Sequence, residues 1–366
     1  MRGVKELASI SLMAIVLLSL YASIRVAYSG DAVLNEIGSI INEVQEIREL
    51  KFKEMPQIIL ITKSQALAMW KPSPRDREQM AIEELTYKMT LLLPPDYNYM
   101  KDQRERSAGW IAATVGNRIY IIRENFLSNG AVAKRSIAHE LTHVLQKQWF
   151  DARYSEDTFD GTLAIRALVE GDADLVADLY CERNGIPIYK IRSLSGDPMT
   201  DINIFSYVFG DRFVRYLYSL GGWKLVNEAY STYPTSTAQV MHPKLYIENV
   251  TPQNVSVNIP KNWKVIRNDR LGEFYVYILL RDAAKETNET AWNISSSWLG
   301  DRLILATNGT DYILLWKVEF SDTKAATRFG EILGKLSRGN TYATYNIRME
   351  GKSVILKAVR RVRNEA

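Results

Sequence analysis

The pentapeptide HELTH, residues 139–143, contains two of the three histidines in a chain of 366 residues. On a helix, side chains four residues apart lie about 40° apart around the axis and one turn apart along it. Both imidazoles can therefore bind one divalent ion with Glu140 beside it, a geometry that suits zinc. With so few histidines, the chance expectation for H-E-x-x-H is only on the order of a few in a thousand. The stretch predicts a zinc-binding helix that follows Ser128-Asn129-Gly130 and ends near Phe150.

Buried histidines with a purely structural role are the simpler alternative for this pair. On a helical wheel, however, the apolar residues of the stretch lie roughly opposite His139 and His143. The two imidazoles should therefore face solvent or a cleft instead of the core. The apolar residues are Ile137, Leu141, Val144 and Leu145.

A tetrahedral catalytic zinc site needs a third protein ligand and keeps its fourth position for water. The next predicted helix, about 162–182, contains the sequence ALVEGDAD at 167–174. Glu170 and Asp174 project together from its polar side, one turn apart. We expect Glu170 to bind the metal and Asp174 to accept the free N–H of a zinc-bound histidine. The alternatives are that His242 is the third ligand, or that the two acids form a solvated face.

These residues resemble the gluzincin metallopeptidases, which carry H-E-x-x-H on one helix and a glutamate ligand on the next. A narrower resemblance is to uncharacterised metallopeptidases with the motifs HELTH, ALVEGDA and S-T-x-Q-x-x-H-P. Here these motifs lie at 139–143, 167–173 and 236–243. The resemblance implies one zinc ion bound by His139, His143 and Glu170, with Glu140 as the general base and Asp174 orienting a histidine. The gap from His143 to Glu170, 170 minus 143 or 27 residues, is longer than in thermolysin-like peptidases.

The predicted function is hydrolysis of peptide bonds in a peptide or protein substrate, with Glu140 acting on a zinc-bound water. His242 is the candidate catalytic donor to the substrate carbonyl oxygen, where charge develops. It could instead be a fourth zinc ligand or a structural turn residue. The predicted strand at 117–122 is expected to offer an edge to an extended peptide. Two other hypotheses remain open: a non-catalytic exported protein with a structural zinc site, and an enzyme that acts on a non-peptide amide.

The N-terminal sequence predicts export. An uncharged run of 18 residues, 7–24, follows Arg2 and Lys5, and small residues suited to signal peptidase follow it. Residues 1–29 are therefore a predicted signal peptide, or an N-terminal membrane anchor through residues 7–24. Five N-glycosylation sequons favour an extracellular or cell-surface location. They begin at Asn249, Asn254, Asn288, Asn293 and Asn308.

The composition, 46% hydrophobic and 24% charged, is that of a globular protein and excludes a disordered or collagenous chain. The net charge of +4 gives no reason to expect nucleic acid as a partner, and the single cysteine excludes an intramolecular disulfide. We predict an α+β fold, with a mostly helical zincin-like catalytic core and small sheet at 30–248 and a smaller α+β domain at 249–366. Further predicted helices lie at 31–53, 81–92, 202–220, 223–230 and 324–336, and strands at 57–62, 117–122, 303–306, 312–320 and 353–359.

Overall fold

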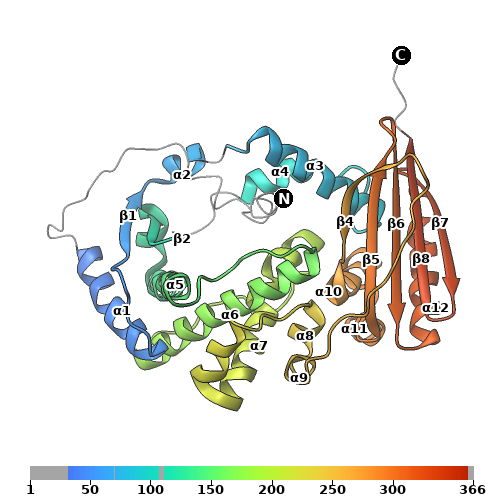
Figure 1. Cartoon of the computed structure of the whole chain (residues 1–366). Helices are drawn as coiled ribbons and strands as arrows, with labels where there is room; N and C mark the ends of the chain where they lie inside the picture. The colour runs from blue at the N-terminus through green and yellow to red at the C-terminus, as the bar shows by residue number, and fades with distance from the viewer. Residues whose placement is uncertain (1–31, 70, 107–110, 362–366) are drawn as a thin grey trace.

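The computed structural model describes residues 32–69, 71–106 and 111–361 (Figure 1). The predicted α+β fold with a helical core is confirmed. The N-terminal part comprises α1 (Ala32–Arg48), β1 (Gln57–Ile61), α2 (Lys63–Met69), α3 (Pro74–Met89), α4 (Tyr99–Arg106), β2 (Ala112–Val115), β3 (Arg118–Ile122), α5 (Arg123–Phe150), α6 (Phe159–Arg183), α7 (Pro198–Ala229), α8 (Thr237–Met241) and α9 (Pro243–Ile247).

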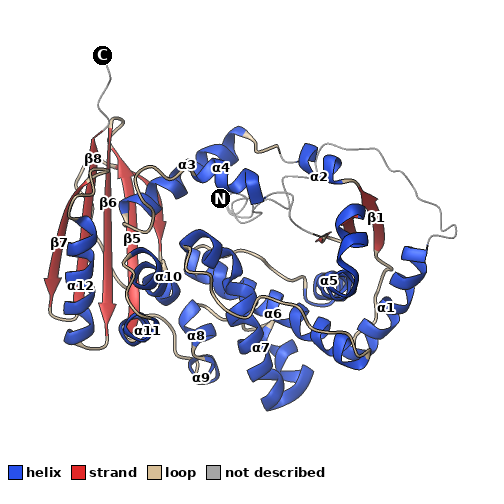
Figure 2. Cartoon of the chain, turned by 180° about the vertical axis from the view of Figure 1, so that it is seen from behind, coloured by secondary structure: helices blue, strands red, loops and turns tan. Residues whose placement is uncertain are grey.

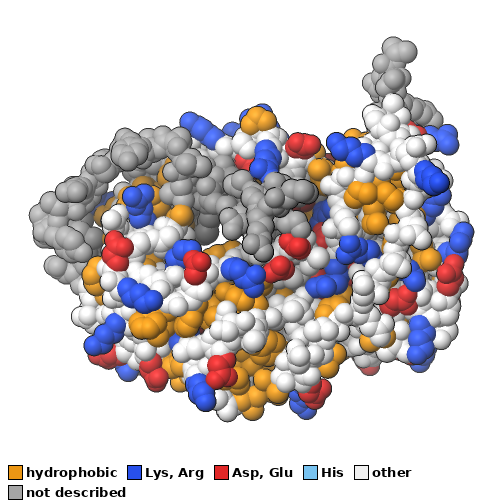
Figure 3. Space-filling view, viewed as in Figure 1, with side chains coloured by type: hydrophobic (Ala, Val, Ile, Leu, Met, Phe, Trp, Pro, Cys, Tyr) orange, Lys and Arg blue, Asp and Glu red, His pale blue; other side chains and the backbone are white. Residues whose placement is uncertain are grey.

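The C-terminal part is built on a five-stranded antiparallel sheet in the order β4-β5-β6-β8-β7. Seen from behind, α12 lies across one face of this sheet, beside α10 and α11 (Figure 2). The segment after α9 runs over the opposite face, where Lys and Arg side chains surround a hydrophobic patch (Figures 1 and 3). The elements are β4 (Lys264–Asp269), α10 (Gly272–Ile278), the π-helix η1 (Leu279–Ala283), α11 (Asn288–Ser295), β5 (Trp298–Thr307), β6 (Asp311–Phe320), α12 (Thr323–Ser337), β7 (Thr344–Glu350) and β8 (Ser353–Arg361).

The small N-terminal sheet has the order β1-β3-β2, with β1 parallel and β2 antiparallel to β3. The predicted strand at 117–122 is therefore present as β3, but the expectation that it offers an edge is wrong. β3 is the central strand, because Ile119 and Ile121 are fully buried and both of its sides are paired. Within the described residues, β1 and β2 are the two edge strands of this sheet, and β2 packs against α5.

Glycines allow the two long helices α6 and α7 to pack closely. A Cβ atom on Gly171 would lie 2.2 Å from the carbonyl oxygen of Gly210, and one on Gly210 would lie 2.3 Å from that of Ala167. Such distances are below van der Waals contact, so only glycine permits this crossing. The crossing brings α7 against the turn of α6 that contains Glu170. The crossing therefore fixes the position of Glu170 relative to α7.

Glycines introduce kinks into two long helices. The helix predicted to follow Ser128-Asn129-Gly130 begins earlier, at Arg123, and Gly130 interrupts it with φ 45°, a left-handed value that favours glycine. Gly221 and Gly222 interrupt α7 at the break predicted between residues 220 and 223.

The main hydrophobic core extends through both parts of the chain. At the junction, Asp160 at the start of α6 accepts hydrogen bonds from Thr237 and from Arg270, which precedes α10. Asp301 on β5 accepts the backbone N–H groups of Leu271 and Gly272. The division at residue 249 thus stays a prediction, and the two parts are joined by buried polar contacts.

The predicted signal peptide or anchor at 1–29, including the run 7–24, lies outside the described residues. In the part of the chain that the structure covers, every helix is too short or too polar to cross a membrane.

Candidate metal centre

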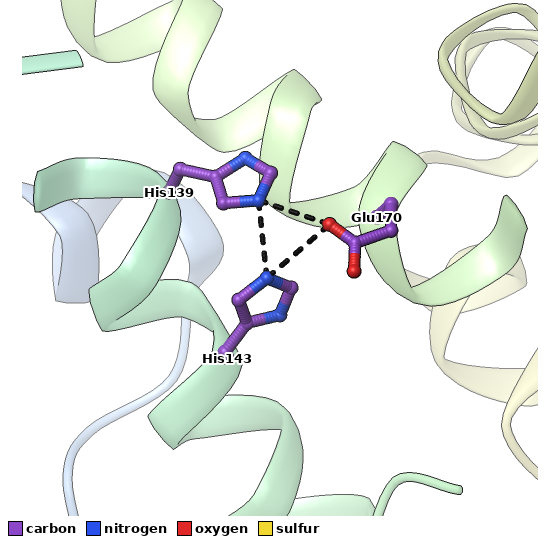
Figure 4. Close-up of side chains that lie close together, drawn as sticks. All are labelled: His139, His143 and Glu170. Atoms are coloured by element: carbon purple, nitrogen blue, oxygen red, sulfur yellow. Dashed lines mark hydrogen bonds and ion pairs between the residues drawn. The ribbon is translucent and has the colours of Figure 1, made fainter. Parts of the chain in front are cut away.

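Two helices bring the three predicted ligands together. The HELTH segment presents His139 and His143 from one face of α5, and α6 presents Glu170 opposite them (Figure 4). The Nε2 atoms of the two histidines are 3.0 Å apart, and Glu170 Oε2 lies 3.1 Å from the first and 3.4 Å from the second. These three residues form a group that could hold a metal ion.

The donor set of this group fits zinc. Zinc binds histidine nitrogen and carboxylate oxygen at about 2.0–2.2 Å in a tetrahedron, which places neighbouring ligand atoms about 3.4 Å apart. The observed separations of 3.0 to 3.4 Å are close to that value. The group therefore fits zinc in both the type and the spacing of its donor atoms. Within the described residues it contains three protein ligands, whereas a structural zinc site has four.

The electrostatics of the group favour a cation. Burial lowers the pKa of His139, but hydrogen bonds to Asp174 and Glu170 and the charges of both carboxylates outweigh it and raise the pKa to about 10. Burial raises the pKa of Glu170, yet the charge of His143 and hydrogen bonds from both imidazoles bring it well below its usual range. A metal ion would replace the imidazole protons, so binding should release protons and weaken at low pH.

His139 has the carboxylate partner that was expected. Its Nδ1 lies 3.1 Å from Asp174 Oδ1, so Asp174 can fix the tautomer that leaves Nε2 for a metal. Arg135, one turn before His139 on α5, donates from Nη2 to the same oxygen at 2.8 Å. Sequence reasoning missed Arg135, although its place one turn before the first histidine was an available signal.

His143 is held by different groups. Its Nδ1 lies 2.8 Å from Gln146 Oε1 and 3.3 Å from the hydroxyl of Tyr154. Gln146 also donates to Asp172, which forms a fully buried ion pair with Arg48 of α1 at 2.8 Å. This cluster of Gln146, Asp172 and Arg48 connects both ligand helices to the N-terminal helix.

Glu140 lies beside the candidate ligands as a buried carboxyl group. Its side chain is buried, and Oε2 has no hydrogen-bond partner among the described residues. Burial raises the pKa of Glu140, although the nearby charges of His143 and His139 act in the opposite direction. The Thr114 hydroxyl of β2 donates to the Glu140 carbonyl at 3.0 Å and ties the edge strand to this turn. A buried acceptor without a partner suits a group that takes a proton from water or substrate.

A cavity of about 370 Å³ opens next to Glu140. It extends from β2 along α5 to the connection between α6 and α7, and Tyr207 of α7 forms part of its wall. The charge of Glu170 and burial raise the pKa of Tyr207 well above its usual value, so the phenol stays protonated at neutral pH. Its lining residues are Ile111, Ala112, Arg135, Ser136, His139, Glu140, Asp174, Lys190, Ile191 and Tyr207.

His242 is not part of the group of three ligands. Its Nε2 lies 2.7 Å from the buried Glu273 of α10, and its ring packs against Trp292 at 5.0 Å between centroids. Other residues of the STAQVMHP motif also make structural contacts: Ser236 caps α8, and Thr237 bonds to Asp160. The catalytic role of His242 stays a prediction, and these contacts place the motif at the junction with the C-terminal part.

Two family models match parts of the chain. A domain of unknown function, DUF8575, matches residues 263–364, which contain the five-stranded sheet. An eCIS core domain matches residues 98–149, which contain β2, β3 and the HELTH segment of α5. A comparison with curated proteins gives no significant match.

Among solved structures, the chain is similar to the crystal structure of a "putative hydrolase with a novel fold" from Chloroflexus aurantiacus. The sequence identity is 11%, and the similarity covers 68% of this chain and 98% of that one. The TM-score of 0.39 is too low to assign a shared fold.

Proposed function

We propose that this chain is a zinc-dependent peptidase of the gluzincin type. The proposal is carried by one observation: three ligand atoms of the right kind converge beside a buried glutamate oxygen that has no partner among the described residues. A zinc ion at His139, His143 and Glu170 would supply a Lewis acid for a carbonyl and lower the pKa of an attacking water to about 7. A structural zinc site would favour a fourth protein ligand.

Glu140 is the general base of the proposed reaction. Its free Oε2 takes a proton from the attacking water and later passes a proton to the leaving amine. The raised pKa of Glu140 brings it closer to the pH at which both transfers must occur. Asp174 and Gln146 keep the two imidazoles oriented while charge builds up at the reacting centre.

Tyr207 is the donor that we propose for the substrate carbonyl oxygen. It lines the same cavity as His139 and Glu140, and its pKa keeps the hydroxyl proton in place. A preorganised donor at a developing oxyanion is typically worth about 3–4 kcal/mol. The sequence assigned this role to His242, which lies outside the lining of this cavity and contacts Glu273 through Nε2.

The edge strand β2 is the proposed docking site for an extended substrate. Ala112 at its start and Ile111 just before it line the cavity, and the Thr114 hydroxyl donates to the carbonyl of Glu140. An added strand would satisfy backbone groups along the open side of β2 and bring a peptide bond to the base.

We further propose that the protein acts outside the cell or at its surface, free or anchored through residues 7–24. The asparagines of all five sequons are exposed, as glycan acceptors must be. They are Asn249, Asn254, Asn288, Asn293 and Asn308.

The proposed function is tested with the substitution Glu140→Gln. The purified full chain should bind one zinc ion and cleave members of a peptide library, and a chelator should stop the cleavage. The Glu140→Gln variant should keep its zinc, measured by elemental analysis, and lose at least about 1,000-fold in cleavage rate, because the base is gone. Cleavage that survives this substitution, or that needs no metal, would overturn the mechanism.

A further inference from the structure

The cavity beside the base has two cationic side chains in its wall. Arg135 comes from α5, and Lys190 comes from the connection between α6 and α7. Both are largely buried, with side-chain exposures of 10% and 7%. Cations this deep are held by paired acids, and here the acids lie on α6 and α7.

The hydrogen bonds of Arg135 leave part of the guanidinium free. Nε donates to Asp178 at 2.9 Å, and Nη2 donates to Asp174 at 2.8 Å. Nη1 makes no hydrogen bond with the described residues, and it is not among the buried atoms that lack a partner. Since Arg135 lines the cavity, this nitrogen is the part of the side chain available to a molecule inside it.

Among the described residues, Lys190 likewise has one N–H bond without an acceptor. Its ammonium group contacts Asp178 at 2.5 Å and Asp211 at 2.8 Å, which uses two of its three N–H bonds. The acids themselves are engaged: Asp178 also binds Arg135 and Arg215, and Asp211 also binds Arg215. Each of the two cations in the cavity wall therefore has an N–H group left for a ligand, because the acids around it already bind other cations.

Besides the two cations, the cavity wall contains apolar residues and two carboxylates. Ala112 of β2, Ile111 just before it and Ile191 next to Lys190 are apolar. The carboxylates are Glu140 and Asp174. The connection that carries Lys190 and Ile191 is also fixed near its end, where Asp201 accepts the N–H groups of Ser195 and Gly196. A ligand group suited to this space has an apolar stem and an anionic end.

We propose that this cavity is a specificity subsite that binds a carboxylate of the substrate through Arg135 and Lys190. The inference rests on the proposed peptidase function and specifies its substrate class. The carboxylate has two sources, an acidic side chain near the cleaved bond or the C-terminus of the peptide. The first makes the protein an acid-directed endopeptidase, and the second makes it trim carboxyl ends.

Binding without hydrolysis tests this subsite. The zinc-loaded full chain with Glu140→Gln is titrated with N-acetylated hexapeptides in which one scanned position is Glu or Gln. Each peptide is made with a free and with an amidated C-terminus. We expect at least about tenfold tighter binding for one carboxylate source, the size of one charge-assisted hydrogen bond. If affinity falls when Glu is replaced by Gln, the recognised carboxylate is the side chain. If affinity falls on amidation, it is the C-terminus. Equal affinities for all four forms, or no binding, would overturn the subsite.

Substitutions then assign the recognition to residues. Lys190→Met keeps the stem and should reduce the preference for the carboxylate at least threefold, while Arg135→Lys keeps the charge and should reduce it partly. The matched control is Lys224→Met on α7, a lysine that is 86% exposed, which should leave the preference unchanged. Preference retained in Lys190→Met and Arg135→Lys would overturn the assignment. If the wild type cleaves peptides without preferring a carboxylate, the subsite fails while the peptidase stands. If the protein prefers carboxylate peptides in binding but cleaves none of them, the subsite stands and the peptidase function fails.

Discussion

The substitution Gly171→Ala should damage the metal centre without touching a ligand. The new Cβ atom would lie 2.2 Å from the carbonyl oxygen of Gly210, and ordinary contact begins near 3.4 Å. The α6–α7 crossing must therefore open by 3.4 minus 2.2, or about 1.2 Å, next to Glu170. Because the ligand atoms lie only 3.0 to 3.4 Å apart, a shift of this size moves the carboxylate out of ligand range.

Two measurements quantify the effect of Gly171→Ala. Overpacking typically costs about 1–3 kcal/mol, which for a chain of this size should lower the melting temperature by about 1–4 °C. Zinc affinity, measured by competition with a chromophoric chelator, should fall at least about tenfold.

The control is Gly334→Ala on α12, where a Cβ atom would meet nothing within 4 Å. That variant should keep its zinc affinity and gain up to about 1 kcal/mol of stability, because alanine favours a helix. If Gly171→Ala binds zinc and melts like the wild type, the close crossing does not position Glu170 and the reasoning is refuted.

Three further predictions concern residues around the site. Asp174→Asn should lower zinc affinity about 10- to 100-fold in equilibrium dialysis, because the ligand imidazole loses its carboxylate partner; unchanged affinity would remove Asp174 from this role. Tyr207→Phe should lower kcat at least about 100-fold with zinc retained, whereas Tyr154→Phe, the matched control, should change it less than tenfold; equal losses would contradict the assignment. Burial lowers the pKa of His242, but the hydrogen bond and charge of Glu273 outweigh it and raise the pKa. The His242–Glu273 ion pair therefore stabilises the fold fully below a pH of about 6.5, and this contribution is lost as the pH rises through the raised pKa of His242. His242→Gln should therefore lower the melting temperature more at pH 6 than at pH 9, and the opposite order would show that the ion pair does not stabilise the fold.

The sequence predicted the parts of the site that depend on helical periodicity. His139 and His143 share a face because they are four residues apart, and Glu170 and Asp174 share one for the same reason. The kink at Gly221 and Gly222 was predicted because glycine weakens a helix wherever it stands. These predictions need only the local geometry of one element.

The parts that the sequence did not predict depend on contacts between distant elements. Arg135 reaches Asp174 across 39 residues, and Gln146 reaches Asp172 across 26. Strand β2 is four residues long and has no alternating pattern, so only its pairing with β3 defines it. His242 was singled out because histidines are scarce, and its position was decided by Glu273, a residue with no distinctive motif.

The ion pair between Arg48 and Asp172 sets an order of events during biosynthesis. Arg48 belongs to the first described helix, yet its partner is made 124 residues later, and Asn227 and Tyr230 complete the cluster later still. The ribosome must therefore release about two thirds of the chain before this cluster, which supports the candidate metal ligands, can form. A nascent or truncated chain that ends before Asn227 has the HELTH helix but lacks this cluster. In the proposed peptidase, this order would delay metal uptake and proteolysis until the helical core is complete.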